Sequence, residues 1–294
     1  MFELSLGIMA YNEEANIGRL LQSVTSQQFV HGQLKEIFVV ASGCSDRTED
    51  IVRDFIEQDT RIRLLVQTRR EGKASAINLF LSCATGEILI LESGDTIPEQ
   101  RTLDQLVAPF KDARIGMTGA HPVPVNKNDT FIGYSVNLMW TLHHRIALRT
   151  PKLGELVAFR NIVKQIPKDT AVDEASIEVI VRGAGYELCY VPEAVVRNKG
   201  PENIRDFIKQ RRRIAAGHKH LLNEQKYEVS TLDPKKILRM LIQEHTWGFR
   251  DSAWTVGAIG LEIIGRALGY YDFHVRKKNP FIWDIASSTK RLES

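Results

Sequence analysis

The sequence predicts an α/β fold with a mostly parallel sheet, and two features of the first hundred residues lead to this prediction. Short apolar runs alternate with helical patterns, as a series of βαβ units requires. Each run is almost continuously apolar, which is typical of a strand that is covered on both faces. The expected strands are residues 4–9, 36–40, 63–67 and 87–91, and the expected helices are residues 13–24, 46–57 and 74–84.

The second part of the sequence mixes both element types. Further strands are expected at residues 117–121, 156–159 and 186–191, with an amphipathic helix at 132–148 and a helix that opens at Asp173-Glu174. A long basic helix is expected from Pro201-Glu202 to about residue 222, because proline fits a first helical turn and an acid suits its positive end. Two more helices and a basic tail are expected after residue 234.

Composition limits the classes of function. The chain has 294 residues and a net charge of only +3, and no basic stripe interleaved with aromatic residues is present, so we expect no nucleic-acid partner. The three cysteines have no metal-like spacing, and a sparse, odd count is typical of reduced thiols in the cytoplasm. No signal peptide is evident, and the longest apolar stretch, residues 253–264, is broken by Glu262 and is too short to span a membrane.

Polar clusters follow four of the expected strands, at residues 12–14, 42–43, 69–73 and 92–95. Because the carboxyl ends of parallel strands meet at one edge of the sheet, we expect these clusters to form one ligand site. Oxygen ligands such as those in Glu92-Ser93-Gly94-Asp95 suit Mg²⁺ or Mn²⁺. Asp95 is the first choice as a metal ligand and Glu92 the second; the alternative is an acidic loop that caps the next helix.

Six short motifs occur in order between residues 4 and 222. They lie at residues 9–14, 39–48, 72–78, 92–95, 173–174 and 210–214. Together they resemble the inverting glycosyltransferases of family 2, which have the GT-A fold: a Rossmann-like, mostly parallel sheet flanked by helices. The chain departs from the usual family pattern at Ala10, Ala41-Ser42, Gly94 and Ile214.

The resemblance implies a donor site for a nucleotide-diphospho-sugar. Tyr11 and Glu13 would contact the nucleobase, while Gln210 and Arg213 would grip the diphosphate, for which arginine is well suited. Ser42 stands where many family members have an aspartate, so both guanine and uracil remain candidates for the base. The expected donor is therefore a UDP- or GDP-sugar. The implied donor-binding residues are Ala10, Tyr11, Glu13, Ser42, Arg70, Lys73, Ser93, Gly94, Gln210 and Arg213. The alternatives are helix capping at residues 12–14 and a solvated charge run at Arg69-Arg70.

The resemblance also implies the reacting groups. Inverting transfer needs a base that takes the proton of the acceptor hydroxyl, and Glu174 matches the family position, with Asp173 as the alternative. Asp95, with Glu92, would hold Mn²⁺ or Mg²⁺, and His218 would complete the metal shell. Without the other motifs, an acidic helix start and a surface histidine would be the simpler interpretations.

The implied activity is metal-dependent transfer of a hexose to a hydroxyl acceptor that is a glycan or is lipid-linked. Residues 1–222 would form the catalytic domain, with a nucleotide-binding half (1–100) and an acceptor half (101–222), and residues 223–294 a helical extension. The helix at 132–148 and Gly154-Glu155 would line the acceptor side. The rival classes are a nucleotidyltransferase, although residues 6–9 lack its glycine-rich loop, and a non-catalytic module that binds nucleotide-sugars.

Aromatic and basic residues between positions 234 and 278 fit a helix that lies in a membrane interface. This pattern predicts a protein that is cytoplasmic or peripheral on the inner face of the membrane. The alternative is a helix pair that packs on the catalytic domain or at a dimer interface, since aromatic stripes at helical spacing usually belong to a core.

Overall fold

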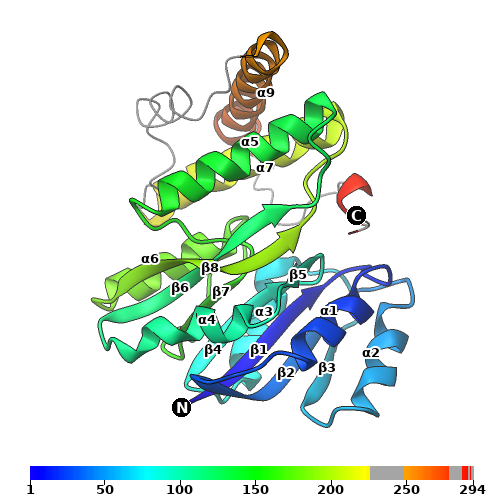
Figure 1. Ribbon diagram of the computed structural model, residues 1–294, viewed down its shortest axis with the longest axis vertical. Coiled ribbons are helices and arrows are strands. Elements are labelled where there is room, and N and C mark those ends of the chain that lie inside the picture. Colours follow the sequence, from blue (N-terminus) through cyan, green and yellow to red (C-terminus); the bar gives the residue numbers. More distant parts are fainter. Residues whose placement is uncertain (226–247, 278–286, 291, 293–294) are drawn as a thin grey trace.

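An eight-stranded sheet forms the centre of the computed structural model, which describes residues 1–225, 248–277, 287–290 and 292. The sheet order is β3-β2-β1-β4-β7-β6-β8-β5, and helices flank it (Figure 1). The strands are β1 (Phe2–Ala10), β2 (Gly32–Ser42), β3 (Ile62–Gln67), β4 (Ile88–Ser93), β5 (Thr96–Pro98), β6 (Ile115–Pro124), β7 (Val157–Arg160) and β8 (Glu187–Asn198). The α-helices are α1 (Ile17–Thr25), α2 (Thr48–Ile56), α3 (Lys73–Cys83), α4 (Thr102–Val107), α5 (Phe131–Ala147), α6 (Asp173–Gly183), α7 (Ile204–Gln225) and α9 (Phe249–His274).

Strand direction confirms the predicted fold class. The first four strands pair in parallel as β3-β2-β1-β4, and β6 is parallel to β8. Strand β7 is antiparallel to both β4 and β6, and β5 is antiparallel to β8. The carboxyl ends of β1 to β4 therefore lie at one edge, as the sequence predicted. The short strand β5 and helix α4 were not predicted.

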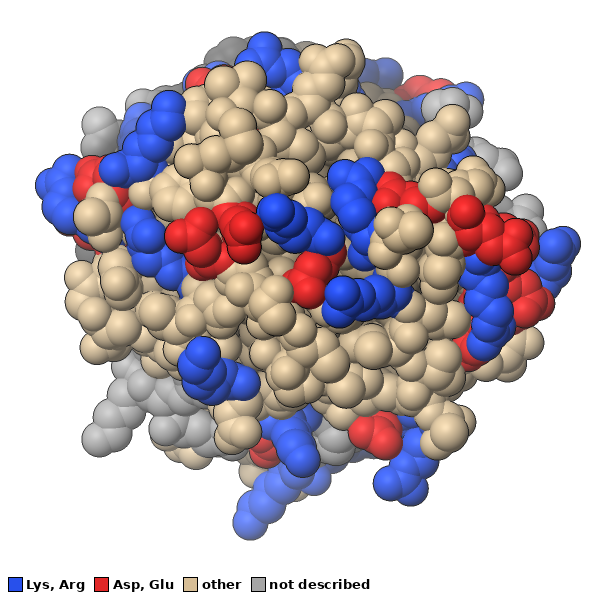
Figure 2. Space-filling view, turned by 90° about the horizontal axis from the view of Figure 1, so that it is seen from below, with Lys and Arg blue, Asp and Glu red and all other residues tan. Residues whose placement is uncertain are grey.

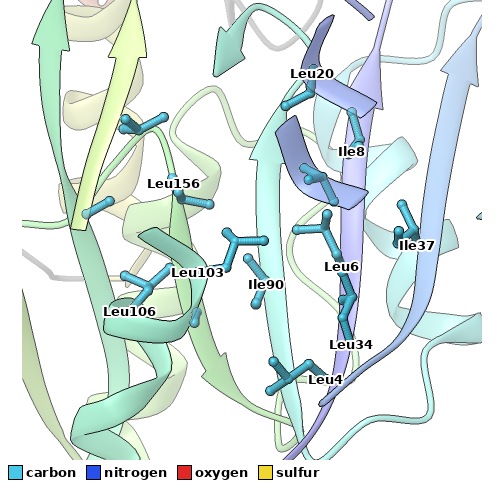
Figure 3. Packing of buried hydrophobic residues seen from close by; sticks show 14 of the residues in the cluster. Leu4, Leu6, Ile8, Leu20, Leu34, Ile37, Ile90, Leu103, Leu106 and Leu156 are labelled. Atoms are coloured by element: carbon cyan, nitrogen blue, oxygen red, sulfur yellow. The ribbon is translucent and has the colours of Figure 1, made fainter. Parts of the chain in front are cut away.

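The sheet is buried on both faces, which explains its apolar strands. On one face, side chains of β1, β2 and β4 pack with α1, α2 and α4 (Figure 3). On the other face, the alternate residues pack with α3 and α6. Leu4, Leu6 and Ile8 point to the first cluster, and Met9 belongs to the second. This alternation, with a period of two, fixes which residues at each strand end face which side.

Helix α9 packs against α5 and α7 on the side away from β1 to β3 (Figure 1). Two glycines permit a close approach: a Cβ at Gly265 would lie 2.6 Å from Arg211 Cβ, and one at Gly269 would lie 2.6 Å from the Arg212 carbonyl oxygen. Arg212 forms two hydrogen bonds to Asp272, both of 2.5 Å. One side of α9 is thus packed on α5 and α7, as the alternative to membrane contact predicted.

The opposite side of α9 is exposed and apolar. Val256, Ile263 and Tyr270 are 70%, 61% and 54% exposed. Within the described ranges, no helix combines the length and apolar character that crossing a bilayer requires. On the face drawn in Figure 2, basic and acidic side chains alternate, so the two signs largely offset one another there.

Glu262 joins α7 to α9, and its replacement should destabilise the protein. Arg211 donates to the Glu262 carboxylate at 2.6 and 2.9 Å, and Arg266 donates at 2.7 Å. Burial raises the pKa of Glu262, but the two arginines outweigh burial and lower it to about 2. A carboxyl whose pKa falls on folding stabilises the protein above its unfolded pKa of about 4.5 and loses that contribution as the pH falls toward 2. We expect Glu262→Gln to lower the free energy of unfolding by about 3 kcal/mol at pH 7.

Urea denaturation of wild type and Glu262→Gln between pH 7 and pH 3 checks this prediction. The difference in unfolding free energy should narrow to less than half by pH 3, because Glu262 of the unfolded wild type becomes protonated below about pH 4.5 while the folded protein still holds it as a carboxylate. The exposed Glu193 on β8 provides the matched control, Glu193→Gln. A difference that stays constant across this pH range would contradict the electrostatic origin.

Candidate active site

The carboxyl edge of β1 to β4 opens into a cleft that holds about 520 Å³. Helices α5, α6, α7 and α9 contribute its other walls. Thirteen of the fifteen residues predicted for the site line this cleft, although they are spread over residues 10–218. They are Ala10, Tyr11, Glu13, Ser42, Arg70, Lys73, Ser93, Asp95, Asp173, Glu174, Gln210, Arg213 and His218. Glu92 and Gly94 do not line it.

The turn after β1 is shaped by Asn12, which has a positive φ of 53°. The asparagine side chain accepts from the Ser45 amide at 2.8 Å, and the Glu13 amide donates to Thr48 Oγ1 at 2.7 Å. Because these contacts hold residues 12–16 as a turn, α1 begins at Ile17 rather than at residue 13 as predicted. The turn leaves Tyr11 and Glu13 at the cleft wall.

Tyr11 and Ser42 provide surfaces that suit a nucleobase. The Arg70 guanidinium lies over the Tyr11 ring, with its Cζ 4.2 Å from the ring centroid. Ser42 is 6% exposed, and its hydroxyl has no hydrogen-bond partner among the described residues. Buried hydroxyls normally have partners, so a ligand that hydrogen-bonds here would complete the Ser42 environment.

Gly94 supports the site through packing between strand ends. Its amide donates to the Met9 carbonyl at 2.9 Å, and a Cβ at this position would lie 2.9 Å from Glu13 Cγ. The close approach that glycine permits is therefore between Gly94 and the turn after β1. Ser93 and Asp95, on either side, face the cleft.

Glu92 is fully buried behind the cleft, and Thr96 donates a hydrogen bond to its carboxyl. It shares a strand face with Ile88 and Ile90, which pack in the cluster under α1 and α4. Burial, together with Glu155 and Asp95, raises the pKa of Glu92 to about 8. Because Glu92 is fully buried and does not line the cleft, it is poorly placed to bind a metal ion there.

Lys73 joins the two acids that open α6. Its ammonium lies 3.0 Å from Asp173 Oδ2 and 2.9 Å from Glu174 Oε1. Gly72, with a φ of 94°, turns the chain so that Lys73 begins α3 at the cleft. Burial raises the pKa of Asp173, whereas for Glu174 the effect of burial is outweighed by Lys73, which holds its pKa below the ordinary value. Glu174 is thus a carboxylate at neutral pH, as a base requires.

Glu155, which the sequence predicts only for the acceptor side, also lines the cleft near Asp95. It has a positive φ of 63°, a strained conformation for a residue other than glycine. Burial raises its pKa to about 7, and Asp95 and Glu174 add to this rise, so Glu155 lies in the electrostatic centre of the site. The only sequence signal was an acid directly before the apolar run of β7.

Asp95 lies among other acidic side chains of the cleft. The charge of Asp95 raises the pKa of Glu13 and of Glu155, which places it among carboxyls that repel one another. Among the described residues, no group of three or more protein ligands has the geometry of a complete metal shell. Mg²⁺ and Mn²⁺ at phosphate sites often use one or two carboxylates and take the remaining ligands from the substrate and water. A site of that kind needs only Asp95 from this cleft.

His218 lies in another part of the cleft, beside Lys152, Arg211 and Arg266. Burial and these cations lower its pKa to about 3, so it is neutral at pH 7. Three basic side chains oppose a divalent cation at this point. We therefore leave His218 out of the proposed metal site. It lies in the part of the cleft that is lined by Lys152, Arg211 and Arg266, which is called the outer half below.

A family model described as "Glycosyl transferase family 2" matches residues 5–166, more than half of the chain. The chain belongs to glycosyl transferase family 2. The matched region contains the four parallel strands and every predicted donor residue up to Gly94, which confirms the resemblance drawn from the sequence motifs.

Two curated proteins are similar to this chain over much of its length. "Probable glycosyltransferase YdaM" of Bacillus subtilis (strain 168) is 24% identical over 252 residues, which cover 80% of this chain and 60% of YdaM. The "Poly-beta-1,6-N-acetyl-D-glucosamine synthase" of Staphylococcus aureus (strain COL) is 25% identical over 231 residues, covering 74% of this chain and 55% of that protein. The chain thus spans little more than half the length of these relatives.

Solved structures confirm the GT-A fold expected for family 2. The mannosyltransferase PcManGT from Pyrobaculum calidifontis, in complex with GDP-Man and Mn²⁺, superposes with a TM-score of 0.64 at 21% identity, covering 95% of this chain and 87% of that one. Glucosyl-3-phosphoglycerate synthase from Mycobacterium tuberculosis, in complex with Mn²⁺, UDP and phosphoglyceric acid, gives a TM-score of 0.54 at 20% identity, with 78% and 80% coverage.

Proposed function

We propose that this family 2 protein transfers a hexose from a UDP- or GDP-sugar to a hydroxyl acceptor, with inversion at the anomeric carbon and with a divalent cation. One observation carries the proposal: Asp95, the Lys73–Glu174 pair and Arg213 line one cleft although they are far apart in sequence. Direct displacement at a sugar diphosphate needs a ligand for the cation, a base and a positive group for the diphosphate, and this cleft has a candidate for each.

Glu174 acts as the base in this proposal. Its carboxylate is held at the start of α6 by Lys73 and faces the cleft, where it takes the proton of the acceptor hydroxyl as that oxygen attacks the anomeric carbon. Asp173 is the alternative base, but burial raises its pKa and it lies deeper, at 3% exposed. Its main contribution is to hold Lys73 from the other side.

The leaving diphosphate is held by basic groups opposite the acids. Arg213 is half-buried at the cleft wall, and the nearby charges of Asp173, Glu155 and Glu174 hold its guanidinium in the protonated state against desolvation, which lowers its pKa. Gln210, one turn earlier on α7, adds an amide donor. Asp95 would hold Mn²⁺ or Mg²⁺, which neutralises charge on the diphosphate when bound.

The outer half of the cleft suits an acceptor that has both an apolar and an anionic part. Helix α5 presents Val136, Met139 and Trp140 to it, while the basic residues Lys152 and Arg266 lie nearby. Burial, together with Arg211 and Arg266, lowers the pKa of Lys152 to about 8, while Glu178 and Glu262 act in the opposite direction. These features favour the lipid-linked acceptor, joined through a phosphate, over a neutral glycan.

Turnover of the donor tests the proposal directly. With Mn²⁺ and either GDP-mannose or UDP-glucose, the wild type should slowly release the nucleoside diphosphate by transfer to water, and EDTA should stop the release. Formation of a nucleoside triphosphate and a sugar 1-phosphate when pyrophosphate is added to the donor would instead indicate a nucleotidyltransferase. Donor binding without any turnover would indicate the non-catalytic module.

The exposed apolar side of α9 leads to a prediction about membranes. Ile263, Tyr270 and Tyr271 lie on α9 near the basic residues Arg276 and Lys277, as in helices that bind an anionic interface. In a flotation experiment, the protein should rise with vesicles that contain phosphatidylglycerol, and Ile263→Ser/Tyr270→Ser should reduce the floating fraction several-fold. A wild type that stays at the bottom with such vesicles would contradict membrane contact without affecting the proposed chemistry.

A further inference from the structure

The end of the chain returns to the cleft. Thr289 and Lys290 line the same hollow as Asp95 and Glu174. The Lys290 ammonium donates to the Tyr11 carbonyl oxygen at 2.9 Å and forms an ion pair with Glu13. The Lys290 side chain thus lies at the turn that contains Tyr11 and Glu13, the residues expected to contact the nucleobase.

Contacts with α1 fix the position of this tail. Asn16 is fully buried; its side chain donates to the Lys290 carbonyl at 2.8 Å and accepts from the Leu292 amide at 3.1 Å. Arg19 donates to the Leu292 carbonyl at 2.8 Å, and Leu292 is only 3% exposed. Because the Asn16 side chain binds two backbone groups of the tail, it fixes which tail residue lies beside the turn. These contacts therefore hold the Lys290 ammonium at Tyr11 and Glu13.

The tail is also bonded to α7. Ser288 Oγ donates to Asp206 Oδ2 at 2.6 Å, close to the start of that helix, and the Glu202 amide donates to Ser288 Oγ at 3.3 Å. Helix α7 carries Gln210 and Arg213, which the proposed function assigns to the diphosphate. The tail therefore connects the nucleotide turn on one side with the diphosphate-binding helix on the other.

The part of the cleft around Asp95, called the inner half, is lined by acidic side chains. Basic side chains must offset this negative charge before a polyanion can bind there. The acidic lining consists of Glu13, Asp95, Glu155, Asp173 and Glu174. The Lys73 ammonium lies between two of these acids, at 3.0 and 2.9 Å. An ammonium group has three N–H donors, and the described structure gives Lys290 two acceptors, the Tyr11 carbonyl and Glu13. One donor of Lys290 remains for a ligand in the cleft.

We propose that Lys290 is a donor-binding residue whose ammonium contacts the diphosphate of the nucleotide-sugar, so that the C-terminal tail forms part of the donor site. This inference rests on the proposed function. It follows from the geometry: a half-buried cation, fixed from two sides, lies in the cleft between the nucleotide turn and the diphosphate-binding helix. The contact would serve the donor and the nucleoside diphosphate product alike.

Calorimetric titration of the full chain with Mn²⁺ tests the proposal, with GDP and guanosine, and UDP and uridine, as probes. For the diphosphate that the wild type binds, Lys290→Met should weaken affinity about 10- to 100-fold, as expected for loss of a hydrogen bond between charged groups. Affinity for the matching nucleoside should change less than twofold. Lys290→Arg should retain most of the affinity, and Lys219→Met, at an exposed position of α7 outside the cleft, should change nothing.

An equal loss for the diphosphate and the nucleoside would overturn the proposal, because it would show that Lys290 only supports the Tyr11–Glu13 turn. Unchanged or tighter binding of the diphosphate by Lys290→Met would overturn it as well. Since Lys290→Met leaves Glu13 without its cation, the comparison is repeated in a Glu13→Gln background, where the same selective loss is expected. A wild type that binds no nucleoside diphosphate would instead refute the proposed function, and the inference would fall with it.

Discussion

Replacing Glu174 with glutamine should reduce sugar transfer about 10²- to 10⁴-fold, the usual contribution of a general base. The amide has almost the same shape as the carboxylate but cannot take the acceptor proton. Lys73 keeps its ion pair with Asp173 at 3.0 Å, so the wall of the cleft should stay in place. The measurement is the initial rate of transfer together with the KM for the donor, and the loss should appear in kcat.

Two further variants make this result specific to Glu174. Glu187→Gln, at an exposed position on β8, should transfer at the wild-type rate. Asp173→Asn separates the two candidate bases, because it should reduce the rate less than Glu174→Gln if Asp173 only holds Lys73. A larger loss in Asp173→Asn would move the role of base to Asp173, and wild-type turnover in both variants would refute a base at the start of α6.

Replacing Asp95 with alanine should remove the metal dependence of the protein. Transfer should fall about 10²- to 10³-fold, as expected when electrostatic stabilisation of the leaving group is lost. Binding of the nucleoside diphosphate should become the same with Mn²⁺ and with EDTA. Calorimetric titration under both conditions measures this directly, with Asp129→Ala as a control at an exposed position.

The same variant should not lose stability, which separates function from folding. Asp95 lies near Glu13 and Glu155, and its charge raises the pKa of both. Removing one of several mutually repelling acids relieves repulsion, so the melting temperature of Asp95→Ala should equal or exceed that of the wild type. A variant that melts well below the wild type would show that Asp95 has a structural role, and its lost activity would then say nothing about the metal.

Most of the site could be predicted because its signals are local. Apolar runs locate the parallel strands, and the rule that their carboxyl ends share one edge brings Ala10, Ser42, Ser93 and Asp95 together without any knowledge of packing. Asp173 and Glu174 were recognised by their place in an ordered series of motifs. The structure brings these two side chains to Lys73, a contact across 100 residues that no local pattern contains.

Three features required the folded chain. The positive φ of Asn12 depends on Ser45, which lies after the next strand, so the start of α1 was placed too early. The complete burial of Glu92 and its contact with Thr96 depend on the packing of α1 and α4 over β4, which no local pattern contains. The contact of Lys290 with Tyr11 spans 279 residues. A lone lysine in a tail has no pattern that would reveal such a contact.

The central claim is that a cation at Asp95 and a nucleoside diphosphate occupy one cleft. A crystal of the protein grown with Mn²⁺ and GDP or UDP tests it most directly, through the anomalous scattering of manganese. The account predicts a manganese peak within bonding distance of the Asp95 carboxylate, with the diphosphate between that peak and Arg213. Manganese bound away from Asp95, or a nucleotide bound outside the cleft, would contradict it.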